Sequence, residues 1–199
     1  MRICVFASGG GSNFKAILKA KSKGFITSGI PLLITNNSNC FATVIARKNG
    51  VSVVHISRSI YPELNEFDYA NIFLKALDDY KIDTIILAGY MKMIEKPVIE
   101  KFRNRILNIH PALLPSFGGK GYYGLNVHKA VIEKGVKISG LTIHLVNENY
   151  DEGRILFQKA VKVKENDNEY TLQKRILKYE HKCYPIVIGL IEKNIIKIG

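Results

Sequence analysis

The sequence predicts an α/β protein with a doubly wound, mostly parallel sheet, to which a carboxyl-terminal β-hairpin and a long helix are added. Short apolar runs rich in β-branched residues alternate with longer segments that have helical spacing. The runs are continuous rather than alternating, which is typical of strands buried on both faces of a parallel sheet. After Pro111 the pattern changes to two longer β-rich runs and one long helical segment.

The α/β part begins with strands and helices in alternating order. Continuous apolar runs predict strands at residues 3–7, 30–35, 51–56, 84–88 and 105–109, and helical spacing predicts helices at 13–23, 41–49 and 66–80. The apolar positions that share a helix face are Phe14, Ile17 and Leu18 on the first helix, and Phe67, Ala70, Phe73, Leu74 and Leu77 on the third. We expect these faces to cover the sheet.

The carboxyl-terminal part is predicted to be a hairpin and a helix. Residues 140–146 and 155–163 have the composition of strands, and the loop 147–153 between them is short enough for antiparallel pairing. A long helix at 169–190 follows, and residues 194–198 are expected to form a short edge strand.

A single domain is predicted over residues 1–199. The chain is long enough for one substantial core and contains no internal repeat and no Pro/Ser-rich linker. A hydrophobic fraction of 47% with 23% charged residues excludes wholesale disorder. No apolar run reaches the roughly 20 residues of a membrane span, and the apolar amino terminus is too short for a signal-peptide core. These features predict a cytoplasmic protein.

Cysteine usage points to a reducing compartment. Cys4, Cys40 and Cys183 are odd in number and far apart, which argues against a disulfide framework and against a zinc site. We expect small buried apolar residues at these positions. The histidines lack metal-ligand spacing as well, so no metal is predicted.

The charge balance is strongly basic. A formal net charge of +12, from 29 basic and 17 acidic residues, would attract nucleic acid, phosphorylated metabolites or polyglutamylated cofactors. The lysines are scattered, however, and no run of five or six like charges occurs. We therefore favour solvated surface charge over a nucleic-acid footprint.

A glycine-rich loop follows the first predicted strand. The segment Ser8-Gly9-Gly10-Gly11-Ser12-Asn13 leads into a helix, where exposed backbone amides attract phosphate. It matches neither the dinucleotide fingerprint nor a Walker loop, because the third glycine and the Gly-Lys-Ser/Thr are absent. Two interpretations stay open: a phosphate site, or a glycine turn in which Ser12 or Asn13 caps the helix.

The strand that ends at Pro111 carries a second candidate site. Strand periodicity places Asn108 and His110 on one face, at the carboxyl end where open α/β sheets bind ligands. An amide donor beside an imidazole can hold a developing oxyanion and carry a proton. The alternative is a strand-end turn, with a histidine that only hydrogen-bonds to backbone.

Asp151 is the candidate partner of that imidazole. A carboxylate next to a histidine favours the imidazolium and orients the ring. The alternative is plain, because Asp151-Glu152-Gly153 is also a good turn between strands. The remaining histidines, His55, His128, His144 and His181, are expected to have structural roles.

Several motifs together resemble the stand-alone, folate-dependent glycinamide ribonucleotide formyltransferases over nearly the whole chain. The matching segments are 8–13, 87–91 (Leu-Ala-Gly-Tyr-Met), 108–115 (Asn-Ile-His-Pro-Ala-Leu-Leu-Pro), 150–153 (Tyr-Asp-Glu-Gly), Glu180-His181 and Tyr184-Pro185. The Asn-x-His-Pro run is specific for the wider formyltransferase superfamily. The glycine loop ending in Gly-Ser-Asn is specific for its purine branch.

The resemblance implies a reaction and a set of residues. The amine of glycinamide ribonucleotide would attack the formyl carbon of 10-formyltetrahydrofolate, a co-substrate, through a tetrahedral intermediate held by Asn108 and by His110, itself kept protonated by Asp151. Gly11, Ser12 and Asn13 would cradle the phosphate, with Gly89 and Glu180 near the amine and ribose. Residues 1–111 would form the ribonucleotide half, and 112–199 the folate-site loops, hairpin and helix. The implied folate site consists of Met91, Lys92, Met93, Ile94, Asn108, Asn147, Glu148, Asn149 and Tyr150.

The sequence departs from the family pattern in two places. An arginine that family members often carry before the aromatic-Asp pair, here Phe67-Asp68, is absent, and Leu64 and Asn65 occupy that stretch. The loop over residues 116–124 is longer and richer in glycine than the common form. It is either a mobile cover over the site or a longer turn.

Two rival functions remain. A formyltransferase could act on another amine, but relatives that formylate methionyl-tRNA add a tRNA-binding domain that 199 residues cannot hold. A basic, non-catalytic module could bind nucleotides or nucleic acid, but no stripe of aromatic residues and lysines supports it. We expect small-molecule substrates, no nucleic acid, no membrane, and a monomer or homodimer.

Overall fold

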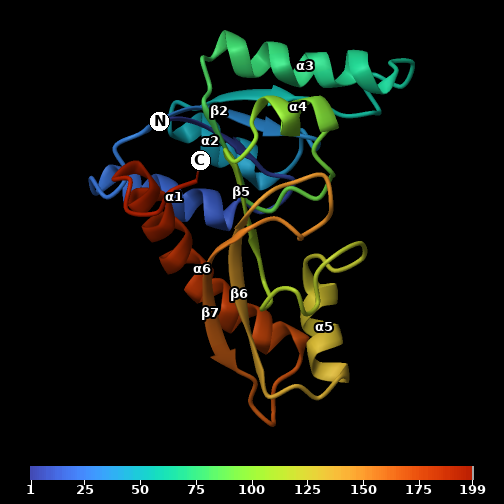
Figure 1. Ribbon diagram of the computed structural model, residues 1–199, viewed down its shortest axis with the longest axis vertical. Coiled ribbons are helices and arrows are strands. Elements are labelled where there is room, and N and C mark those ends of the chain that lie inside the picture. The colour runs from blue at the N-terminus through green and yellow to red at the C-terminus, as the bar shows by residue number, and fades with distance from the viewer. Residues whose placement is uncertain (199) are drawn as a thin grey trace.

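A computed structural model describes residues 1–198 of the chain (Figure 1). The strands are β1 (Arg2–Phe6), β2 (Gly29–Thr35), β3 (Ser52–His55), β4 (Thr84–Leu87), β5 (Ile106–His110), β6 (Ile138–Leu145) and β7 (Ile155–Lys162). The helices are α1 (Ser12–Ser22), α2 (Phe41–Lys48), α3 (Glu66–Asp79), α4 (Lys96–Lys101), α5 (Leu125–Glu133) and α6 (Glu169–Glu192). The predicted α/β fold class is confirmed, including the hairpin and the long final helix.

All seven strands belong to one sheet in the order β3-β2-β1-β4-β5-β6-β7. Strands β1 to β5 run parallel, whereas β6 pairs antiparallel with both β5 and β7. The chain begins at the centre, winds outward to β3, and then returns to β4 on the other side of β1. This reversal between β1 and β4 leaves a crevice at the carboxyl ends of the strands, which is where such sheets bind ligands.

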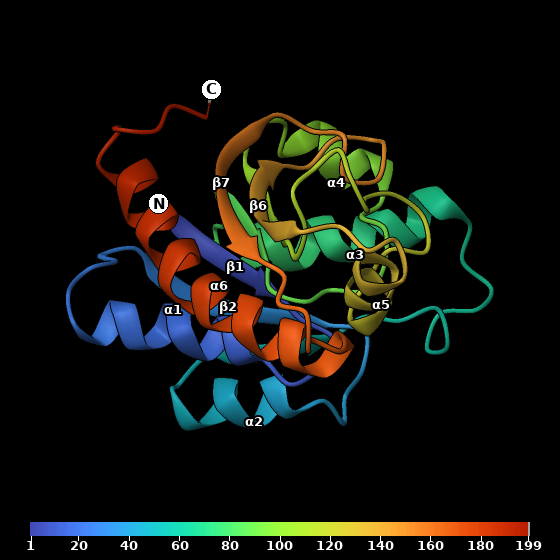
Figure 2. The same ribbon diagram turned by 90° about the horizontal axis from the view of Figure 1, so that it is seen from below.

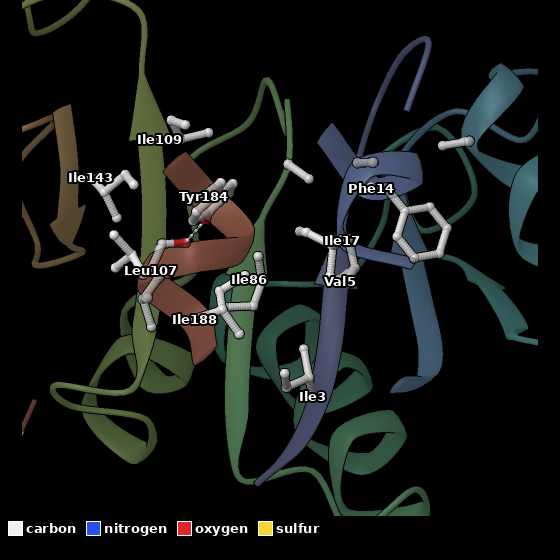
Figure 3. Packing of buried hydrophobic residues seen from close by; sticks show 14 of the residues in the cluster. Ile3, Val5, Phe14, Ile17, Ile86, Leu107, Ile109, Ile143, Tyr184 and Ile188 are labelled. Atoms are coloured by element: carbon white, nitrogen blue, oxygen red, sulfur yellow. Dashed lines mark hydrogen bonds between the residues drawn. The ribbon is translucent and has the colours of Figure 1, made fainter. Parts of the chain in front are cut away.

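Helices cover both faces of the sheet, with α1, α2 and α6 on one side and α3 and α4 on the other (Figure 2). Strand β1 shows how the continuous apolar runs serve both layers. Ile3 and Val5 pack with Phe14 and Ile17 of α1, while Cys4 and Phe6 pack with the α3 and α4 layer. Figure 3 shows the apolar cluster that contains Ile3, Val5, Phe14 and Ile17, and this cluster continues to α6. The central strands β1 and β4 are therefore buried on both faces, as their sequences predict, whereas the edge strand β3 is only partly buried.

Several expected elements differ from the structure. Residues 194–198 form no strand: Asn194 takes a positive φ of 55°, and the amides of Ile195 and Ile196 turn back to the Leu190 carbonyl. The predicted face of the third helix is wrong at Phe67, which is 65% exposed, because Tyr69 takes the buried position. Helices α4 and α5 were not predicted. Pro97 lies in the first turn of α4, where proline is well tolerated.

Candidate active site

A cavity of about 650 Å³ lies at the carboxyl ends of the central strands. Its walls come from the glycine loop after β1, the loop after β4, the end of β5, the loops around 119–124 and 147–151, and one face of α6. All three catalytic candidates and all five predicted ribonucleotide residues line it: Asn108, His110, Asp151, Gly11, Ser12, Asn13, Gly89 and Glu180.

Asn108, His110 and Asp151 form one cluster in this cavity. Strand β5 places Asn108 and His110 two residues apart, and the loop after β6 returns Asp151 to them with a positive φ of 59°. The Asp151 carboxylate lies 3.5 Å from His110 Nδ1 and 3.5 Å from Asn108 Nδ2. The sequence could not show that Asp151 reaches His110, and the structure places the two side chains in contact.

The charge state of His110 is subject to opposing influences. Its Nε2 donates to the Phe117 carbonyl at 2.8 Å and its Nδ1 faces Asp151, so only the doubly protonated ring satisfies both acceptors. Burial of the ring nevertheless has the larger effect and lowers the pKa of His110, against the raising effects of Asp151 and Phe117. Burial therefore works against the expected effect of Asp151 on the His110 proton, and the charge state of the ring in the resting site stays a prediction.

The surroundings of Asp151 favour its ionised form. Burial raises its pKa, but the neighbouring His144 and His110 and the Gly119 backbone amide together hold the pKa of the carboxyl below its usual value. The amide of Gly119 donates to Asp151 Oδ2 at 3.0 Å. An ionised carboxylate next to a neutral imidazole is a pair that can take up and stabilise one proton during a reaction.

His144 is a member of the cluster that the sequence reading missed. Its Nδ1 donates to the Leu145 carbonyl at 2.8 Å, which leaves Nε2 as an acceptor for Asn108 Nδ2 at 3.1 Å. The signal was available in principle, because antiparallel pairing of β5 with β6 sets Asn108 opposite His144. Without a known register, a histidine in an apolar strand reads as a packing residue.

The glycine loop and α6 meet at a second polar pair. Asn13 Nδ2 donates to Glu180 Oε2 at 2.6 Å, and burial raises the pKa of Glu180. Asn13 Oδ1 is buried and has no hydrogen-bond partner among the described residues. Gly11 has a φ of 65°, and a Cβ there would lie 2.9 Å from Ala42, so only glycine lets the loop pass so close to α2. The loop therefore brings the amino terminus of α1 to the cavity.

The residues predicted to bind folate line the cavity with one exception. Those that line it are Met91, Lys92, Met93, Ile94, Asn108, Asn147, Asn149 and Tyr150. Glu148 is absent from the lining, and its carboxylate lies 3.4 Å from Arg103 at a partly exposed position.

The glycine-rich segment 116–124, for which the sequence allowed either a cover over the site or a longer turn, also reaches the cavity. Phe117 and Gly119 bond to His110 and Asp151, and Lys120, Tyr122 and Tyr123 contribute to the lining. In the structure this segment is therefore part of the site and contacts its central residues directly.

Residues 1–198 contain neither a metal-binding group nor a membrane-spanning helix. No group of three or more His, Cys, Asp or Glu side chains in this range is placed to hold a metal ion. None of the helices described is long and apolar enough to cross a membrane.

Comparison with known proteins identifies the family. A family model described as formyl transferase matches residues 1–188. Phosphoribosylglycinamide formyltransferase, chloroplastic, of Arabidopsis thaliana is 46% identical over 196 residues, which cover 98% of this chain and 67% of the relative. The phosphoribosylglycinamide formyltransferase of Bacillus subtilis is 34% identical over 187 residues, covering 94% of this chain and 92% of the relative.

A solved structure agrees with these relatives. Glycinamide ribonucleotide transformylase 1 from Symbiobacterium toebii superposes with a TM-score of 0.89 at 37% identity, covering 98% of this chain and 88% of that one. The chain spans about two thirds of the plant relatives' length, 67% and 62%, and 19% of the trifunctional purine biosynthetic protein of Homo sapiens. The resemblance inferred from the motifs is confirmed, and the chain belongs to the formyl transferase family.

Proposed function

We propose that this protein transfers the formyl group of 10-formyltetrahydrofolate to the amine of 5'-phosphoribosylglycinamide, a step of de novo purine biosynthesis. The observation that carries the proposal is the contact of Asn108, His110 and Asp151 in a cavity that also contains the glycine loop. The names of the relatives from Arabidopsis thaliana and Bacillus subtilis support this substrate.

The chemistry requires one bond to form and one to break. The substrate amine attacks the formyl carbon, a C–N bond forms, and the carbonyl oxygen of the formyl group becomes an oxyanion. Collapse of this tetrahedral intermediate breaks the bond between the formyl carbon and the folate nitrogen. One proton has to leave the attacking amine, and one has to reach the departing nitrogen.

In this scheme Asn108 stabilises the oxyanion and the His110–Asp151 pair transfers the proton. Asn108 donates a hydrogen bond to the oxyanion, a contact whose loss typically costs roughly 3–4 kcal/mol of transition-state stabilisation. The neutral imidazole of His110 accepts the amine's proton and passes it to the folate nitrogen. The ionised Asp151, 3.5 Å away, stabilises the imidazolium that exists in between.

The two substrates would occupy opposite ends of the cavity. Gly11, Ser12 and Asn13 bind the phosphate through backbone amides and side chains at the start of α1, with Gly89 and Glu180 near the amine and ribose. The pterin lies along Met91–Ile94 and the 147–150 loop. Residues 1–111 thus carry most of the ribonucleotide site together with Met91–Ile94 of the folate site, and 112–199 supply the 147–150 loop, the hairpin and α6 with Glu180.

The proposed setting follows from the same reaction. The partners are small molecules rather than nucleic acid, the folate is a co-substrate, and no metal takes part. We place the protein in the cytoplasm as a monomer or homodimer. The plant relatives carry the description chloroplastic, which is a statement about those proteins.

Formyl transfer by the purified protein tests the proposal. Loss of 10-formyltetrahydrofolate is followed by absorbance in the presence of phosphoribosylglycinamide, for the wild type and for Asn108→Ala and His110→Ala. We expect turnover in the wild type and a loss of about 100-fold to 1,000-fold in Asn108→Ala. Wild-type protein that binds folate but transfers no formyl group would point to another amine as the acceptor. Variants with normal turnover would contradict the assignment of the site.

A further inference from the structure

Ser8 connects the loops that follow three neighbouring strands. Its hydroxyl donates to Asn36 Oδ1 after β2 at 2.5 Å and accepts from the Met91 amide after β4 at 3.0 Å. Both roles are fixed, because an amide oxygen can only accept and a backbone N–H can only donate. The Ser8 amide also donates to the Gly89 carbonyl at 3.0 Å.

The position of Ser8 gives these bonds a consequence for ligand binding. The next residues, Gly9 to Asn13, belong to the lining to which the phosphate is assigned, and Met91 begins the lining stretch to which the pterin is assigned. Ser8 is half-buried and is itself absent from the lining. Its hydroxyl therefore bonds to the Met91 backbone from the residue that directly precedes the glycine-loop lining, and Ser8 itself does not line the cavity.

We propose that the Ser8 hydroxyl is a positioning group that couples the two substrate sites, so that each bound substrate raises the affinity for the other. This coupling rests on the proposed function, since it assigns the phosphate to the glycine loop and the pterin to Met91–Ile94. A pterin that fixes the Met91 backbone also fixes the hydrogen bond to Ser8, and with it the start of the glycine loop. The phosphate then binds a loop that is already ordered, so less conformational entropy is lost on binding. Thermodynamic linkage makes the effect on the two affinities reciprocal.

The substitution Ser8→Ala isolates this hydroxyl. It removes one oxygen at a half-buried position and leaves the Ser8 amide bond to Gly89 in place. The conservative variant Ser8→Thr retains a hydroxyl that can make both contacts. Ser22→Ala, at the far end of α1, serves as the distant control, because within residues 1–198 this hydroxyl bonds only to the Lys19 carbonyl.

The coupling is measured with ligands that do not react. Tetrahydrofolate has no formyl group to transfer, so its dissociation constant can be determined by calorimetry with and without saturating phosphoribosylglycinamide. The ratio of interest is the dissociation constant of tetrahydrofolate without phosphoribosylglycinamide divided by the constant with it. We expect this ratio to be about fivefold or more in the wild type, in Ser8→Thr and in Ser22→Ala. In Ser8→Ala we expect the ratio to fall below about twofold. A variant that merely disturbed the folate site would raise both dissociation constants and leave their ratio unchanged.

The outcomes separate this inference from the function on which it rests. A wild-type ratio of one, or an unchanged ratio in Ser8→Ala, would overturn the coupling while formyl transfer by the wild type still upheld the proposed reaction. Wild-type protein that bound neither ligand would overturn both. A ratio lost in Ser8→Ala and kept in Ser8→Thr would support the coupling.

Discussion

At the scale of single residues, the pH dependence of the proposed reaction follows from the surroundings of His110. The base form of the ring is needed, so the rate falls as pH falls through the pKa of His110. Burial lowers this pKa from 6.5, and Asp151 opposes that effect. The acid limb of kcat/KM is therefore expected below pH 6.5.

Replacing Asp151 by asparagine tests this balance. The Asp151→Asn variant keeps the shape but removes the charge that raises the pKa of His110, so the acid limb should move to lower pH. The imidazolium formed during turnover also loses its partner, and kcat should fall about 100-fold or more. A pH–rate profile from pH 5 to 8 measures both effects. An acid limb that moved to higher pH would contradict this account of His110.

His144 is expected to act through Asn108 rather than on the substrate. Its Nε2 accepts one Asn108 amide hydrogen and so fixes the orientation of the amide. The variant His144→Asn keeps a polar group near Nδ1 but loses the distal acceptor, which should lower kcat about 10-fold to 100-fold, as expected for about 1–3 kcal/mol from an unpaired buried group. His144→Gln, whose oxygen can reach the Nε2 position, should retain more activity. Equal losses in the two variants would assign His144 a packing role only.

At the scale of secondary-structure elements, the sequence predicts buried strands better than it predicts the contacts between elements. The runs at 3–7 and 84–88 lie between helices on both faces, and such burial leaves an apolar signal that needs no knowledge of the neighbours. The tail at 194–198 has the same composition, but Ile196 and Ile198 pack against the core without pairing to a strand. Composition reports burial, whereas only tertiary contacts decide whether a strand forms.

The candidate site shows the same division between local and distant information. Asn108 and His110 share a face because of strand periodicity, so the sequence alone relates them. The contacts of Asp151 with His110 and of Asn13 with Glu180 join residues 41 and 167 positions apart, and depend on how the hairpin and α6 return to the sheet. The roles given to these residues stay predictions until the variants are measured.

Helix α6 offers a test of an element that supplies the site from a distance. Asn168 caps the helix, accepting from the Tyr170 and Thr171 amides, while Thr171 bonds back to the Asn168 amide. Asn168→Ala should lower the free energy of unfolding by about 1 kcal/mol, measured by urea titration. Lys178→Ala, an exposed change on the same helix, should lower it much less. Equal values for the two variants would show that the cap does not stabilise the fold.

At the scale of the whole molecule, acid stability depends on histidines buried without charged partners. His128 of α5 is 2% exposed, and its Nδ1 has no hydrogen-bond partner among the described residues. Burial, with a smaller effect of His110, lowers the pKa of His128 to about 4. The unfolded chain binds the same proton near pH 6.5, so between these values the unfolded state holds more protons and stability falls as pH falls.

The variant His128→Gln removes this proton uptake and should flatten the profile. The gap between pH 6.5 and about 4 corresponds to about 3 kcal/mol that the wild type loses on acidification and the variant does not. Urea unfolding at pH 7 and at pH 4 measures the difference between the two proteins at each pH. His181 carries a pKa shift in the same direction from burial alone and remains in both proteins, so its contribution cancels in this comparison. The smaller coupling between His110 and His128 is lost in the variant and is counted with the effect of His128. An equal loss in wild type and variant would show that His128 binds its proton in the folded protein as readily as in the unfolded chain, and the acid sensitivity would then arise elsewhere in the core.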